Sequence, residues 1–81
     1  MRAVFVMIKT EPGHTTDVAN RVAEVPAFSE CYSITGQYDL LAKLYVDDID
    51  SIGRVIERDI QSIPHVRETF TILTFEAFGV R

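Results

Sequence analysis

The chain has 81 residues, of which 47% are hydrophobic and 25% are charged, and its formal net charge at pH 7 is -4. This length fits one domain, and a domain this small buries only about 60% of its unfolded surface, which favours self-association. The composition is too apolar for a disordered chain and too often interrupted by charge for a membrane span. The acidic balance, with Lys and Arg scattered singly, argues against binding to a nucleic-acid backbone.

The first part of the chain predicts a strand followed by a helix. Residues 3–8 are apolar throughout and too few for a stable helix, which indicates a strand that is buried on both faces. After a Pro-Gly turn, apolar residues recur on one helical stripe. We expect this helix to be capped by Thr15 or Thr16 and to be stopped by Pro26.

The rest of the chain predicts a hairpin, a second helix and a last strand. Residues 27–35 and 38–46 are strand-like runs on either side of a short turn that contains glycine, as in a β-hairpin. Ile and Val at helical spacing then predict a helix that ends at Pro64. Residues 66–78 alternate in polarity and predict a long last strand. The order β-α-β-β-α-β predicts an α+β fold, a ferredoxin-like sandwich, in a single domain that spans residues 1–81.

Both faces of the predicted sheet are apolar. The third strand places Leu41 and Tyr45 opposite its other apolar side chains, and helices cover only one face. The last strand is expected to alternate Phe70, Ile72 and Phe78 on one face with Leu73, Phe75 and Ala77 on the other. An open apolar face exceeds what a soluble monomer normally exposes. We therefore expect a homodimer with facing sheets. The alternative is that these residues are only strand-forming side chains exposed to solvent.

No catalytic or metal-binding constellation stands out. His14 and His65 lie far apart in sequence and are expected to be loop residues, because no Cys, Asp or His is spaced to complete a metal site. Cys31 has no basic neighbour and predicts a small buried hydrophobic side chain. A single cysteine forbids an internal disulfide and fits a reducing compartment. No signal peptide is recognisable, so we expect a cytoplasmic protein without metal or cofactor.

The one segment with concentrated polar groups is the turn of the hairpin. It reads Thr35-Gly36-Gln37-Tyr38-Asp39. Exposed turn N–H groups can donate hydrogen bonds to an α-carboxylate, and the Asp39 carboxylate or Thr hydroxyls can accept them from an α-ammonium group, so the turn could hold a zwitterion. A hairpin needs glycine in such a turn whatever its function, and this structural alternative stays open.

The residues around this turn are similar to a known family. Residues 30–43, with their Thr-Gly-x-Tyr-Asp hairpin, and residues 63–71, with Ile-Pro-x-Val and Thr-x-Thr, resemble the effector-binding domain of the Lrp/AsnC regulators. The resemblance implies a dimeric α+β barrel with facing antiparallel sheets, further assembly into octamers or similar rings, and an amino-acid effector bound between dimers. By position, Gly36, Tyr38 and Asp39 would contact the backbone part of the effector, and Thr69 and Thr71 would line the same pocket.

Two departures from the family pattern qualify this resemblance. His65 stands where glycine is common after Ile-Pro, and the first strand follows Met1 with no helix-turn-helix segment before it. We therefore expect a stand-alone form without a DNA-binding domain, which acts on transcription by co-assembly with full-length regulators rather than as an enzyme. Two alternatives stay open, because a fold does not decide function. They are a small dimeric enzyme of the monooxygenase or isomerase type and a purely structural oligomerisation partner.

Overall fold

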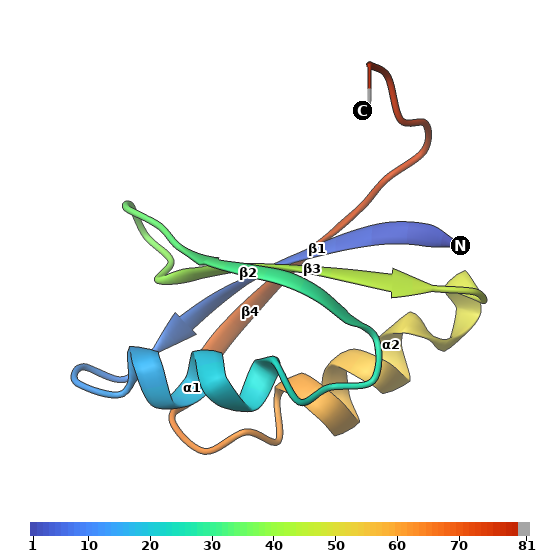
Figure 1. Cartoon of the computed structure of the whole chain (residues 1–81). Helices are drawn as coiled ribbons and strands as arrows, with labels where there is room; N and C mark the ends of the chain where they lie inside the picture. Colours follow the sequence, from blue (N-terminus) through green and yellow to red (C-terminus); the bar gives the residue numbers. More distant parts are fainter. Residues whose placement is uncertain (80–81) are drawn as a thin grey trace.

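Four antiparallel strands form one sheet, and the helical segments lie on one of its faces (Figure 1). The computed structural model describes residues 1–79. Its elements are β1 (Arg2–Thr10), α1 (Thr15–Val22), β2 (Phe28–Ser33), β3 (Leu40–Val46), η1 (Ile49–Ser51), α2 (Ile52–Val55), η2 (Ile56–Ile60) and β4 (Val66–Leu73). The strand order β2-β3-β1-β4 is that of the ferredoxin-like fold, so the predicted fold class is confirmed.

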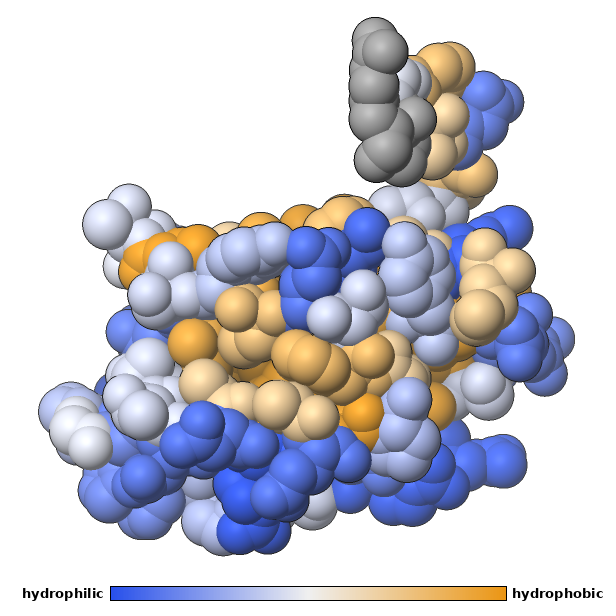
Figure 2. All heavy atoms as spheres, viewed as in Figure 1, coloured by the Kyte–Doolittle hydropathy of each residue, from blue (hydrophilic) through white to orange (hydrophobic). Residues whose placement is uncertain are grey.

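The core lies between the sheet and the helices. Side chains alternate along β1, so that Val4, Val6 and Ile8 are fully buried against the helical layer. Alternate residues of β3 and the apolar stripes of the two helical segments complete this core. Its other members are Val18, Val22, Val25, Leu40, Ala42, Leu44, Val46, Ile56, Ile60 and Ile63. Figure 2 shows that hydrophilic residues gather on the outer surface of the helical layer.

The opposite face of the sheet has no helix over it. The register places Phe5 opposite Ile72 and Met7 opposite Phe70, and Met7 also faces Leu41 of β3. The side chains of Phe70 and Ile72 are exposed in the single chain. The prediction that both faces of the sheet are apolar is confirmed for these strands, and we call this second surface the open face.

The last strand is shorter than the sequence predicted. β4 ends at Leu73 rather than Phe78, because the Thr74 hydroxyl donates a hydrogen bond of 2.6 Å to the Ala3 carbonyl and the chain then leaves the sheet. Phe75, Ala77 and Phe78 therefore do not alternate across a strand. Residues 74–79, which we call the C-terminal arm, rise on the side of the sheet that the helices leave uncovered (Figure 1).

The first helix differs from the prediction at both ends. It begins at Thr15, but His14 holds the N-cap position and neither Thr15 nor Thr16 makes a capping hydrogen bond. The Thr15 hydroxyl instead lies 2.8 Å from the Thr10 hydroxyl. The helix ends at Val22, four residues before Pro26. The N–H groups of Glu24 and Val25 donate to carbonyls three residues earlier, which is the pattern of a tighter turn and not of an α-helix.

The second helical stretch is irregular and the hairpin is looser than expected. Asp48 caps η1 by accepting from the Asp50 N–H at 3.0 Å, and the stretch then passes through an α-helical turn into the π-helical segment η2. In the hairpin, β2 and β3 are joined by the six residues 34–39 rather than by a tight turn. This longer connection gives the sheet an exposed loop at the end where β1 finishes and β4 begins.

Candidate functional site

The loop of residues 34–39 is anchored by backbone hydrogen bonds at its ends. The Ile34 N–H donates to the Asp39 carbonyl at 3.0 Å, and the Asp39 N–H donates to the Ile8 carbonyl at 2.9 Å. Between these anchors Gly36 has a φ angle of +110°, which side chains other than that of glycine rarely allow. The glycine that the sequence analysis singled out is therefore required by the backbone of this loop.

The tip of the loop presents backbone donors to solvent. Within residues 1–79, the N–H groups of Thr35, Gly36, Gln37 and Tyr38 make no hydrogen bond, and the first three of these residues are exposed. Successive free N–H groups form a concave surface of partial positive charge that suits an anion. The loop can therefore accept a carboxylate without losing an internal hydrogen bond.

The carboxylate of Asp39 is already engaged by the protein. Its Oδ2 atom accepts from the Thr10 N–H at 2.8 Å and from the Thr10 hydroxyl at 3.2 Å. Because that hydroxyl proton points to Asp39, the Thr15 hydroxyl must be the donor in its 2.8 Å contact with Thr10. Thr10 is only 5% exposed. Asp39 thus ties the loop to the end of β1 and to the first residue of α1.

Two further side chains border the loop. Lys9 Nζ donates to the Gln37 carbonyl at 3.3 Å, which places a cation beside the free N–H groups. The Tyr38 ring is half-buried and lies with its centroid 6.3 Å from that of Phe70, on the open face. Lys9 and Thr10 were not found by the sequence analysis. Their place depends on the pairing of β1 with its neighbours, for which the sequence carries no local signal.

Thr69 and Thr71 do not join the loop within one chain. They pair with Ile8 and Val6, whose side chains face the helices, so they belong to the face of β4 opposite Phe70. The Thr69 hydroxyl accepts from Gln61 Nε2 at 2.9 Å, and Thr71 lines a groove beside α2. Of the seven predicted site residues, Thr35 to Asp39 therefore lie together in the loop at the end of the sheet, whereas Thr69 and Thr71 lie apart from them on the helix side of β4.

The two histidines, predicted to be separate loop residues, lie in contact. Their rings stack with centroids 3.5 Å apart and planes inclined by 9°. Glu11 Oε2 lies 3.4 Å from His65 Nδ1, and Asp17 Oδ2 lies 3.6 Å from His14 Nδ1. Stacked rings hold their nitrogen lone pairs in parallel planes, so the pair does not converge on a metal ion. Residues 1–79 contain no group of three His, Cys, Asp or Glu side chains that could hold a metal.

A polar cluster lies on the β2–β3 part of the open face. Tyr32 donates its hydroxyl to Glu30, and Lys43 Nζ lies 3.5 Å from Glu30 Oε2 and 5.0 Å from the centre of the Tyr45 ring. The hydrogen bond from Tyr32 lowers the pKa of Glu30, and the same bond raises the pKa of Tyr32. Cys31 follows Glu30 in the chain but pairs with the buried Ala42 on the other face of the sheet, where partial burial raises the pKa of its thiol.

The described part of the chain has two surfaces that are open to a partner or a ligand. It has an anion-accepting loop and a sheet face without cover, which are the features of a small ferredoxin-like binding domain. Its family follows from the sequence: the model of the Lrp/AsnC ligand binding domain matches residues 3–79, and the chain belongs to this family. The predicted resemblance is confirmed.

Two comparisons illustrate the extent of the likeness. An uncharacterized HTH-type transcriptional regulator from Pyrococcus abyssi is 31% identical over 75 residues, which make up 89% of this chain and 50% of the regulator. The crystal structure of the protein TTHA0845 from Thermus thermophilus has a TM-score of 0.91 and 32% identity, and the match covers 99% of this chain and 100% of that one. The chain spans about half the length of the curated regulators from Pyrococcus abyssi and Pyrococcus horikoshii that it matches.

A third comparison concerns a structure with a bound amino acid. The complex of the transcriptional regulator NMB0573 from Neisseria meningitidis with L-Met has a TM-score of 0.82 and 16% identity, and covers 93% of this chain and 50% of that one. At this identity the likeness shows the fold alone. The family is defined by a ligand-binding domain and these relatives are named regulators, so the prediction of a binding module rather than an enzyme is confirmed. No helix in residues 1–79 is long and apolar enough to cross a membrane.

Proposed function

We propose that this chain is a sensor of small zwitterions, most simply of amino acids, that assembles through its open face and changes transcription through full-length regulators of its family. The observation that carries the proposal is the row of free N–H groups from Thr35 to Tyr38 beside the cation of Lys9. Membership of a ligand-binding family supports it. We propose that it acts in the cytoplasm, a reducing compartment that the single cysteine fits.

The loop supplies complementary groups for both ends of an amino acid. Its free N–H groups and Lys9 would hold the α-carboxylate. Asp39 keeps Oδ1 without a hydrogen bond in residues 1–79, so this oxygen would accept from the α-ammonium group while Oδ2 stays bound to Thr10. Asp39 then has two tasks, since it fixes the loop and also contacts the effector.

A complete pocket would need more than one copy of the chain. Thr69 and Thr71 lie on the helix side of β4 while Tyr38 leans to the open face, so one effector could touch all of them only where chains meet. We propose a homodimer with facing sheets, which cover the open face, and a higher oligomer in which loop and threonines from neighbouring chains form the pocket. An effector held there would stabilise the assembled state by its greater affinity for that state.

Thermal denaturation with each of the twenty amino acids tests the sensing role. A ligand at a hundred times its dissociation constant adds about 2.7 kcal/mol to the free energy of unfolding, which raises Tm by on the order of 10 °C in a domain of this size. At least one amino acid should do so. Flat melting temperatures with all twenty at millimolar concentration would contradict amino-acid sensing and favour the purely structural partner.

Two substitutions at one position separate the tasks of Asp39. Asp39→Asn keeps an oxygen that can accept from Thr10 but loses the charge, so it should retain most of the stability and weaken the ligand-induced rise in Tm. Asp39→Ala should reduce both. A full response to ligand in Asp39→Asn would show that the carboxylate only positions the loop.

A further inference from the structure

We infer that the C-terminal arm, residues 74–79, is a clamp that grips a second copy of this chain, with Phe75 and Phe78 as its anchors. The inference rests on the proposed face-to-face dimer and names the contacts that hold it. The arm begins where the Thr74 hydroxyl binds the Ala3 carbonyl, and it then leaves its own sheet. Figure 1 shows it standing clear of the strands on the side opposite the helices.

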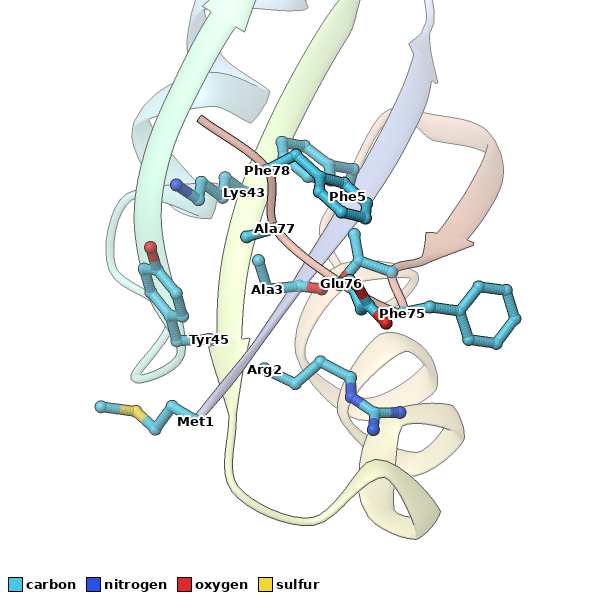
Figure 3. A pocket seen from close by; sticks show the side chains of 11 residues that line it. Met1, Arg2, Ala3, Phe5, Lys43, Tyr45, Phe75, Glu76, Ala77 and Phe78 are labelled. Atoms are coloured by element: carbon cyan, nitrogen blue, oxygen red, sulfur yellow. Dashed lines mark hydrogen bonds between the residues drawn. The ribbon is translucent and has the colours of Figure 1, made fainter. Parts of the chain in front are cut away.

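The two aromatic side chains of the arm have no partner of their own in residues 1–79. Phe75 is 92% exposed and Phe78 is 83% exposed, more than any other aromatic side chain described. Figure 3 shows the Phe75 ring pointing away from the other labelled side chains. Large aromatic side chains gain more than most from burial and are frequent anchors of interfaces. Two of them on one short arm indicate that another surface covers them.

The space beneath the arm points to the same occupant. A cavity of about 460 Å³ lies between the arm and the open face, bordered by Phe5, Lys43 and Tyr45 of the sheet and by Phe78 of the arm (Figure 3). It continues the apolar open face that carries Phe70 and Ile72. A copy packed on that face would place side chains in this cavity, and a two-fold axis would bring each arm onto the other chain.

The charges of this region suit a second copy better than a charged ligand. Lys43 is paired with Glu30, and the other two charged side chains that border the cavity, Arg2 and Glu76, are exposed and of opposite sign. A buried charge without a partner would oppose association, whereas a paired one permits it. The arm itself carries Glu76, which is exposed and free to stay in solvent at the rim.

The dimer dissociation constant, measured by sedimentation equilibrium, tests the clamp. We expect the double variant Phe75→Ser/Phe78→Ser to raise it at least tenfold and to leave the far-UV circular dichroism unchanged. Glu76→Gln, a change on the same arm that keeps both aromatic rings, should leave the constant within twofold of the wild-type value. An unchanged constant in the double variant would overturn the clamp.

A fluorescent probe reports on the arm directly. The chain has no tryptophan, so Phe78→Trp would supply the only indole. We expect its emission to be blue-shifted at concentrations where the dimer forms and to shift to the red on dilution. Red-shifted emission in a dimeric sample would overturn the clamp but leave the face-to-face dimer standing. A wild-type chain that is monomeric at every concentration would overturn both.

Discussion

Asp39 Oδ2 lies 2.8 Å from the backbone nitrogen of Thr10, which is 29 positions away in the chain. This contact joins the exposed loop and its free donors to the strand at the centre of the sheet. Thr10 is the one buried polar residue among residues 1–79. Its hydroxyl also forms a hydrogen bond with the hydroxyl of Thr15 at the start of α1. The shape of the loop therefore depends on a buried residue outside the loop itself, through both the backbone N–H and the hydroxyl of Thr10.

Thr10→Val removes that hydroxyl while keeping the shape of the side chain. Asp39 loses one donor and Thr15 loses its acceptor, so the free energy of unfolding should fall by about 1–2 kcal/mol. The Asp39 N–H, which binds the Ile8 carbonyl, should exchange faster with solvent as the loop loosens. Urea denaturation and amide hydrogen exchange measure these effects.

Thr16→Val is the matched control for this substitution, because Thr16 lies on the outer side of α1 and makes no side-chain hydrogen bond in the described chain. Its effect on stability should stay within about 0.5 kcal/mol. Equal effects of Thr10→Val and Thr16→Val would show that the buried network does not hold the loop.

His65 adopts a φ angle of +75°, in the left-handed region, and stacks on His14. Glycine relieves the backbone strain but loses the stacking, whereas alanine loses the stacking and keeps the strain. His65→Ala should therefore be less stable than His65→Gly by about 1 kcal/mol. Thermal denaturation of the two variants measures the difference, and equal stability would contradict the strained conformation.

The stacking itself is measured by adding His14→Ala to the wild type and to His65→Gly. The cost of His14→Ala should be smaller in the His65→Gly background by about 0.5–1.5 kcal/mol. A coupling close to zero would mean that the two rings do not stabilise each other.

The pair of Glu30 and Tyr32 predicts a loss of stability in acid. The Tyr32 hydrogen bond, and after it Lys43, lowers the pKa of Glu30 from its ordinary value of 4.5. A carboxyl whose pKa is lower in the folded state stabilises the fold fully above its unfolded pKa, and that contribution is lost as the pH falls through the folded value. The wild type should be more stable than Glu30→Gln above pH 4.5, and the difference should shrink below it.

Urea denaturation from about pH 7 to pH 3 measures this difference. Tyr32→Phe removes the hydrogen bond that lowers the pKa most, so the stability of this variant should fall less steeply in acid than that of the wild type. A difference between wild type and Glu30→Gln that stays constant over the whole range would contradict the assignment.

The open face predicts that substitutions at two positions of β4 have different effects on association. Phe70 lies on that face and is 53% exposed in the single chain, while Arg67 is exposed near the start of the strand. Phe70→Ser should weaken association by about 2 kcal/mol, or roughly thirtyfold in the dissociation constant. Arg67→Ser should change it little. Equal effects in sedimentation equilibrium would contradict association through the open face.

The sequence predicts the layers of the fold well because they depend on local periodicity. The apolar run of β1, the alternation of β3 and the helical spacing of Ile56 and Ile60 are visible without any neighbour, and each lies in an element of the predicted type. The alternating burial along β1 is seen only in the structure. The predicted end of β4 was wrong. Apolar alternation continues to Phe78 in the sequence, but the Thr74 hydroxyl donates to the Ala3 carbonyl, which would otherwise accept the next backbone hydrogen bond between β1 and β4.

The candidate site is less predictable, because its contacts join distant parts of the chain. The loop residues Thr35 to Asp39 are apparent from their turn chemistry, and Gly36 has the conformation that such a turn requires. The roles of Thr10 and Lys9 depend on strand pairing. The stacking of His14 on His65 joins the start of α1 to the start of β4, and neither segment alone predicts it.

The solution mass of the purified chain tests the central claim most directly, since both the inter-subunit pocket and the clamp need a second copy over the open face. Light scattering at micromolar concentration should give at least twice the chain mass of 9.2 kDa. A mass of 9.2 kDa across the concentration range, in a folded sample, would contradict the account.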